Sequence, residues 1–334
     1  MKGSNVLVCL DQSFVPDSFL VMRILMLGAT GTIGQATLEE LLRRGHDVVC
    51  FGRSHNKSNS TQRVGDVTDA ASIDRDGFWS EAFDAVLSCM ASRSGLPRDA
   101  WAIDHRAHSL ILQAAKKHGV KHFVLLSAIC VQKPKLAFQH AKLAFEAELV
   151  ASGLTYSIVR PTAYFKSLSG QVARVMKGKP YLVFGDGQMT SCKLISDGDL
   201  ARYMANCLED PRLQNAVLPI GGPGPASTPC AQGKQLFNLM GKAPRFRHVP
   251  VAMMDVIIFV LSGLGRFSQR SADKAELARI GRYYATESML VWNHGTNTYD
   301  ADVTPSFGTE TLQQFHEKMI KGEATIDLGE AAVF

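Results

Sequence analysis

The chain has 334 residues, of which 46% are hydrophobic and 20% are charged, and this composition argues against a disordered protein. The net charge of +5 suits an anionic small molecule or an acidic membrane surface, and no basic block interleaved with aromatic residues indicates a nucleic-acid partner. The seven cysteines form no CxxC pair, and we expect no bound metal. No run of ~18–20 uninterrupted apolar residues predicts a membrane span.

The folded part is predicted to begin at Met22, which is a second candidate start, after an N-terminal extension over residues 1–21. The apolar run 24–27 predicts a buried parallel strand. The apolar spacing over residues 32–44 predicts the helix that follows it.

Three glycines separate this strand from this helix, in the sequence GATGTIG. Gly28 permits a tight turn, Gly31 lets a pyrophosphate approach the backbone, and Gly34 lets helix and strand pack closely. The free N–H groups of the helix start favour phosphate. The stretch therefore predicts a dinucleotide site built from Gly28, Thr30, Gly31, Thr32, Ile33 and Gly34.

The second predicted strand, 48–51, is followed by Arg53 and not by a carboxylate. An NAD enzyme usually places Asp or Glu there to hold the ribose hydroxyls, whereas a guanidinium pairs with the 2′-phosphate of NADP. Lys57 adds a second positive charge nearby. Asp66, after the third strand, is expected at the adenine, with a plain turn aspartate as the alternative. The pattern favours NADPH over NADH.

Strands and helices then alternate regularly, with strands predicted at 83–89, 122–127 and 155–159 and helices at 98–118 and 138–152. This alternation predicts an α/β fold of the Rossmann type, a doubly wound parallel sheet, over residues 22–165. Ligands bind at the carboxyl ends of parallel strands. Residues expected at the cofactor for this reason are Ser88, Ser127, Pro161 and Thr162.

Beyond Phe165 the rhythm loosens, and residues 166–334 are expected to form a smaller substrate-binding lobe interleaved with the sheet. Strands are predicted at 181–184 and 217–220, and helices at 196–209, 228–240 and 309–321. The most apolar segment, 251–267, has three interpretations: a buried helix, a wall for a large apolar ligand, or a surface helix that touches a membrane.

The helix after the fifth strand carries Lys142, but the position four residues earlier holds Phe138. Short-chain dehydrogenases usually pair a Tyr with a Lys at this spacing, which places both groups on one helix face. Without the tyrosine, alcohol–ketone chemistry is disfavoured. Reduction of an activated C=C bond fits better, because the developing charge spreads into the substrate. Lys142 is expected to position the cofactor ribose or to relay a proton.

Several longer stretches carry a resemblance to a known family: LLSAICVQKP from Leu125, FQHAKLAFEAEL from Phe138, YSIVRPTAYFKSLSGQV from Tyr156, GKPYLVFGDG from Gly178, LPIGGPG from Leu218 and IGRYYATESML from Ile280. With them the chain resembles an atypical short-chain dehydrogenase/reductase of the NmrA/isoflavone-reductase-like kind. More narrowly, it is similar to the NADPH-dependent, ferredoxin-independent 8-vinyl reductases of 3,8-divinyl (proto)chlorophyllide a. The resemblance spans nearly the whole chain from Met22 onward.

The resemblance implies that NADPH reduces the 8-vinyl group of a tetrapyrrole to ethyl in chlorophyll or bacteriochlorophyll biosynthesis. The proton donor stays open between Lys142, Tyr164 and water. Tyr164 and Phe165 are candidates to stack on the macrocycle, with plain core positions as the alternative. Lys166 and Lys193 are candidates for the propionate carboxylate, and Tyr283 and Tyr284 favour a large flat ligand.

Two other functions remain open: reduction of another conjugated substrate, as in isoflavone reductases, and NADP sensing without catalysis, as in NmrA-like regulators. The resemblance implies a cytoplasmic protein, peripheral to a photosynthetic membrane, or a plastid protein in a plant or alga. Neither the oligomeric state nor the preferred macrocycle follows from the sequence.

Overall fold

A seven-stranded parallel sheet forms the centre of the computed structural model, which describes residues 21–55 and 60–323. The expected extension, apart from Val21, and Lys57 lie outside the described residues. The sheet confirms the predicted Rossmann-type fold. In spatial order its strands are β3 (Thr61–Val64), β2 (Asp47–Gly52), β1 (Arg23–Leu27), β4 (Ala85–Ser88), β5 (His122–Leu126), β6 (Thr155–Pro161) and β8 (Ala216–Ile220).

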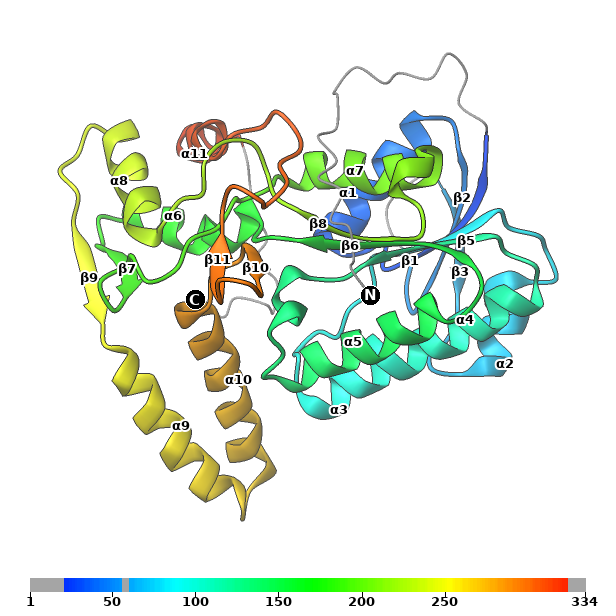
Figure 1. Cartoon of the computed structure of the whole chain (residues 1–334), viewed down its shortest axis with the longest axis horizontal. Coiled ribbons are helices and arrows are strands. Elements are labelled where there is room, and N and C mark those ends of the chain that lie inside the picture. Colours follow the sequence, from blue (N-terminus) through cyan, green and yellow to red (C-terminus); the bar gives the residue numbers. More distant parts are fainter. Residues whose placement is uncertain (1–20, 56–59, 324–334) are drawn as a thin grey trace.

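Side chains alternate between the two faces of the sheet, so each face has its own core. Ile24 and Met26 of β1 pack on one face and Leu25 and Leu27 on the other, all fully buried. Figure 1 shows the helices covering both faces. On the first face lie α1 (Thr32–Arg43) and α7 (Asp197–Glu209). On the other lie α2 (Ala70–Ser72), η1 (Ile73–Phe78), α3 (Pro97–Ala100), η2 (Trp101–Ala107), α4 (His108–Lys117) and α5 (Ala137–Val150).

The helix predicted over 98–118 differs in detail from the observed one. Its middle, η2, is π-helical and joins α3 to α4. π-helical turns are rare in proteins, and those that occur are often found at functional sites. Here the wide turn carries Asp104, whose side chain lies in the candidate site described below.

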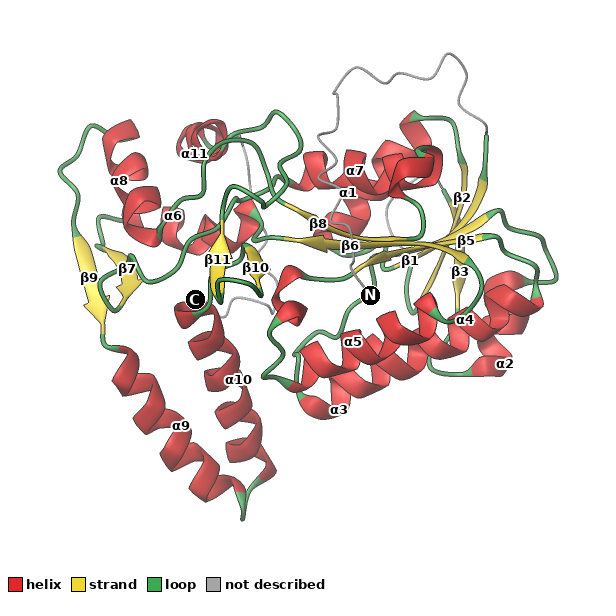
Figure 2. Cartoon of the chain, viewed as in Figure 1, coloured by secondary structure: helices red, strands yellow, loops and turns green. Residues whose placement is uncertain are grey.

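The chain after β6 builds a smaller body beside the sheet, although β8 returns to the sheet itself. Figure 2 shows this body as short strands among helices. Its helices are η4 (Phe165–Leu168), α6 (Ser169–Met176), α8 (Pro229–Leu239) and α11 (Leu312–Lys321), and its strands are β7 (Tyr181–Phe184), β9 (Phe246–Val249), β10 (Val291–Asn293) and β11 (Thr298–Asp300). The short helices η3 (Ile129–Gln132) and η5 (Pro211–Leu213) lie in connections of the sheet.

A helical hairpin projects from the smaller body (Figure 1), formed by α9 (Val251–Gly265) and α10 (Gln269–Thr286). No residue of α9 is buried, so the interpretation of segment 251–267 as a buried helix is wrong. The main contact of α9 is with α10, and most of its large apolar side chains are exposed. Among the described residues, no helix combines the length and the apolarity needed to cross a membrane.

Candidate cofactor and substrate site

The glycine turn between β1 and α1 has the geometry of a phosphate-binding turn. Gly28 adopts φ +75°, and its carbonyl oxygen accepts a hydrogen bond from Gly31 N at 3.1 Å. A Cβ on Gly28 would stand 2.5 Å from Met90 N, and one on Gly34 would stand 2.0 Å from Gly28 O. A Cβ on Gly31 would meet only Gly28 O, at 3.6 Å. Space therefore remains open above Gly31, at the N-terminus of α1, where a diphosphate would lie.

The predicted serine and threonine positions at the strand ends are buried, and their hydroxyls are occupied by the protein. Ser88 Oγ lies 2.9 Å from His108 Nε2 and accepts from Met90 N. Ser127 Oγ donates to Glu146, which also pairs with Arg160. The hydroxyl of Thr162 donates to Lys193 O, and Pro161, the residue before it, is buried as well. These residues lie at the carboxyl ends of β4, β5 and β6, and their contact with a cofactor remains a prediction.

Lys142 of α5 is fixed by a buried carboxylate. Its Nζ is 3.1 Å from Oδ1 of Asp104, whose side chain is fully buried. Asp104 also accepts from the backbone N of Ser92 at 3.1 Å and from its hydroxyl at 2.5 Å. Removing one partner of such a buried pair would leave an uncompensated charge, so the pair holds the Lys142 ammonium in one place.

A cluster of weak acids faces the same region. The Oη of Tyr284 lies 3.8 Å from Cys130 Sγ, and Tyr164 is an electrostatic neighbour of Cys89, Cys130 and Tyr284. Burial raises the pKa of Tyr164, of Tyr284 and of the Cys130 thiol, and it raises the pKa of Cys89 to about 12. All four groups are therefore protonated at neutral pH.

Tyr283 and Tyr284 take different places although they are neighbours on α10. Tyr283 is buried, and its hydroxyl donates to the carbonyls of Cys130 at 2.9 Å and Lys133 at 3.1 Å. It fixes α10 to the body, whereas Tyr284 has a partly exposed ring whose hydroxyl reaches the site.

The end of α10 is tied to the same loop by Glu287. Burial would raise the pKa of Glu287, but hydrogen bonds from Lys133, Lys135 and Tyr299 hold it at about 2. Glu287 is therefore ionised at neutral pH and fixes the base of the hairpin.

Three other predicted substrate residues have partners within the protein. Phe165 is 3% exposed and packs against Phe315, with ring centroids 5.2 Å apart. Lys193 Nζ donates to Thr304 O at 2.8 Å. Lys166 Nζ donates to Thr32 Oγ1, at the first residue of α1, so it faces the glycine turn, and its contact with a propionate carboxylate stays a prediction.

Arg53 and Asp66 lie together at the other end of the site, after β2 and β3. Both are exposed, and they interact electrostatically. The hydroxyl and backbone N of Thr68 donate to Asp66 and, with a smaller contribution from Arg53, hold its pKa below the usual value. The guanidinium of Arg53 lies directly after the second strand, and its contact with a 2′-phosphate stays a prediction.

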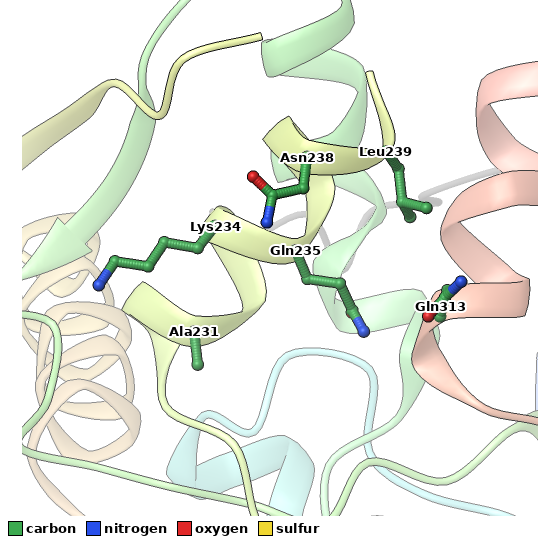
Figure 3. Close-up of a pocket in the computed structure, with 6 residues that line it drawn as sticks. All are labelled: Ala231, Lys234, Gln235, Asn238, Leu239 and Gln313. Carbon is green, nitrogen blue, oxygen red and sulfur yellow. The ribbon is translucent and has the colours of Figure 1, made fainter. Parts of the chain in front are cut away.

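A separate hollow lies away from these residues, between α8 and α11. Figure 3 shows Gln235 and Leu239 of α8 directed toward Gln313 of α11, while Lys234 extends to the other side. The lining is mixed, with polar and apolar side chains, and Lys234 is its one titratable group. We assign no chemistry to it. Among the described residues, no three His, Cys, Asp or Glu side chains come close enough to hold a metal ion.

Sequence reasoning missed Asp104, Cys130 and Glu146. Glu146 could have been found, because it lies four residues after Lys142 on α5 and therefore on the same helix face. Asp104 and Cys130 carry no local signal, since their partners come from distant parts of the chain.

The comparisons with known proteins agree with this geometry. A family model described as NAD(P)H-binding matches residues 28–211. A chloroplastic divinyl chlorophyllide a 8-vinyl-reductase of Oryza sativa subsp. indica is 48% identical over 93% of this chain and 82% of its own length. The Arabidopsis thaliana protein of the same name is 45% identical over 92% and 79%. The solved UDP-glucose 4-epimerase of Thermotoga maritima superposes with a TM-score of 0.65 at 19% identity, over 91% of this chain and 100% of its own, and shows the fold alone.

The fold and the site define an oxidoreductase with an NAD(P)H-binding Rossmann domain. The glycine turn, the parallel strand order and the fixed lysine on α5 are its structural elements. Within this class the chain belongs to the divinyl chlorophyllide a 8-vinyl-reductase family.

Proposed function

We propose that this protein reduces the 8-vinyl group of divinyl chlorophyllide a, or of the protochlorophyllide, to an ethyl group with NADPH. A hydride and a proton add across the C=C bond and NADP⁺ is released, so atoms and electrons balance. The observation that carries the proposal is the 48% identity, over 93% of the chain, to a reductase named for this substrate and this vinyl group. The phenylalanine at position 138 supports it, because vinyl reduction requires no adjacent acid for an alkoxide.

Hydride transfer is the chemistry that bound NADPH would supply. We assign its diphosphate to the N-terminus of α1, where Thr30, Gly31 and Thr32 lie in the turn. Lys166 lies over this turn and would add a positive charge to it. Burial raises the pKa of the neighbouring Asp197, and Lys166 partly opposes this effect. The raised pKa makes Asp197 a weaker counter-charge to Lys166 than an ordinary carboxylate.

NADPH, and not NADH, is the proposed reductant because Arg53 follows β2 where a carboxylate would favour NADH. The guanidinium is exposed and electrostatically linked to Asp66. A bidentate contact with the 2′-phosphate would use the planar donor set of Arg53.

For the proton we propose Tyr164 as the donor, with Lys142 positioning the cofactor ribose. Tyr164 stays protonated at neutral pH because burial raises its pKa. Lys142 is fixed by Asp104, which suits a positioning role. The variant Tyr164→Phe distinguishes proton donation by Tyr164 from donation by Lys142 or by water.

We also propose that the protein works beside a photosynthetic membrane. Four curated relatives of this family that are 45–48% identical to the chain are named as chloroplastic, which supports a plastid location if the chain comes from a plant or alga.

The proposed function is tested by mixing the purified protein with divinyl chlorophyllide a and NADPH, with NADH in parallel, and separating the pigments by chromatography. We expect the monovinyl product with NADPH and little with NADH. The variant Lys142→Met should lose most activity, whereas Lys121→Met, an exposed lysine before β5, should keep it. Tight NADPH binding without product would refute the reaction and favour another conjugated substrate or an NADP sensor.

A further inference from the structure

Helix α9 presents an apolar surface to solvent that the fold does not use. Phe259 is 80% exposed and Phe267, just after the helix, is 91% exposed. We call the whole set the α9 face; its members are Met253, Val256, Ile257, Phe259, Val260, Leu264 and Phe267. Monomeric proteins rarely expose a contiguous patch of this kind without a binding partner.

Five of the seven members of the α9 face follow one side of the helix. Met253, Val256, Ile257, Val260 and Leu264 recur at intervals of three and four, which makes a single stripe. The opposite side of α9 packs against α10, through less exposed residues and through links such as Arg279 to Ser262 at 2.6 Å. The stripe therefore points away from the hairpin partner.

Positive charge gathers around this apolar stripe. Residues 242–274 contain six basic and two acidic side chains, a net +4 out of +5 for the whole chain. One of the two acids, Asp255, is paired with Arg282 of α10. The basic residues lie before α9 and after it, namely Lys242, Arg245, Arg247, Arg266, Arg270 and Lys274.

We infer that the α9 face docks on an anionic lipid surface, with α9 lying in the plane of the interface. A helix of 15 residues is about 22 Å long, which is too short to span a bilayer but suits an interfacial position. Phe259 and Phe267 enter the acyl boundary, and the basic residues at both ends of α9 reach anionic headgroups. Clusters of four to eight basic residues beside an amphipathic helix have this property.

The charge pattern favours lipid over a second copy of the chain. Because both ends of α9 are basic, a twofold contact between two α9 faces would bring positive charges together in either orientation. An anionic surface neutralises them instead. The docking also has a geometric consequence, because α10 carries Tyr284 into the site and so links the docked hairpin to it.

The test uses the full-length protein and sedimentation with vesicles of phosphatidylcholine alone or mixed with phosphatidylglycerol. We expect binding to the mixed vesicles only. Phe259→Ser with Phe267→Ser should weaken it at least tenfold, whereas Val150→Ser with Met176→Ser, exposed apolar residues elsewhere, should not. NADPH binding, measured in parallel, should be unchanged in every variant, which separates this test from that of the proposed reaction.

A second pair of variants tests the charge. Arg266→Gln with Arg270→Gln should weaken binding to the anionic vesicles by roughly tenfold or more, since each charge contributes about fivefold. Lys116→Gln with Lys121→Gln, exposed lysines near α4, is the matched control. Failure to bind mixed vesicles would overturn the inference. The inference would also be overturned if Phe259→Ser with Phe267→Ser changed the native mass in analytical ultracentrifugation and left vesicle binding intact. The α9 face would then join two copies of the chain.

Discussion

Gly31 and Gly34 of the β1–α1 turn should respond differently to substitution by alanine. In Gly34→Ala the new Cβ would lie 2.0 Å from Gly28 O, a backbone atom, and real Cβ contacts essentially never fall under 3.0 Å. The turn must therefore move by about 1 Å, and overpacking of this kind costs about 1–3 kcal/mol of unfolding free energy.

In Gly31→Ala the nearest atom to the new Cβ is Gly28 O at 3.6 Å, an ordinary contact, and φ is −76°. The unfolding free energy should therefore change by no more than about 0.5 kcal/mol. The methyl group would stand where the diphosphate is proposed to approach the helix N-terminus. Losing one charge-assisted hydrogen bond costs about 1.5–3 kcal/mol, so the Kd for NADPH should rise roughly 10- to 150-fold.

The assay combines urea unfolding without ligand and NADPH titration by fluorescence on the same protein preparations. Gly34→Ala should lower the urea midpoint, and Gly31→Ala should leave it at the wild-type value while weakening NADPH. Equal destabilisation by the two variants would refute the packing argument. Wild-type NADPH affinity in Gly31→Ala would refute the placement of the diphosphate.

Three further predictions concern single side chains. Arg53→Gln should raise the Kd for NADPH by about tenfold or more and leave that for NADH unchanged, because only NADPH carries the 2′-phosphate; an equal effect on both would place Arg53 elsewhere. Tyr164→Phe should lower kcat for vinyl reduction by roughly 10²–10⁴ without altering NADPH affinity, and an unchanged kcat would identify Lys142 or water as the proton donor. His316 is buried, neither ring nitrogen has a partner among the described residues, and burial lowers its pKa to about 4. Since the unfolded chain binds this proton near pH 6.5, stability is lost as the pH falls from about 6.5 to about 4. His316→Leu should remove up to about 3 kcal/mol of that loss, measured as urea midpoints at pH 7.5 and 4.5, and an unaltered pH dependence would contradict it.

The start of the Rossmann domain could be predicted because its signals are local. An apolar strand, three glycines and an amphipathic helix follow one another within about twenty residues, and parallel topology restricts how such units assemble. The structure adds the atom that Gly34 approaches, which is the carbonyl oxygen of Gly28, directly after the end of β1.

The candidate site was predictable only where one element carries the signal. Lys142 on α5 was found from helix spacing. Its partner Asp104 lies in a π-helical turn, which the hydrophobic periodicity of the sequence does not predict. Lys166 is a substrate candidate from the family resemblance, and only the fold shows that it contacts Thr32, which is far away in the sequence. Such pairings depend on how separate elements pack, which local patterns do not encode.

By itself, the sequence determined the parallel sheet, the glycine turn and the absence of a tyrosine four residues before Lys142, because each depends on neighbouring residues. Only the tertiary structure decided that α9 is exposed. The hydrophobicity of a segment indicates how strongly its transfer out of water is favoured. It does not indicate which surface covers the segment. Helix α9 has the composition of a core helix, but the hairpin carries it away from the body, and none of its residues is buried.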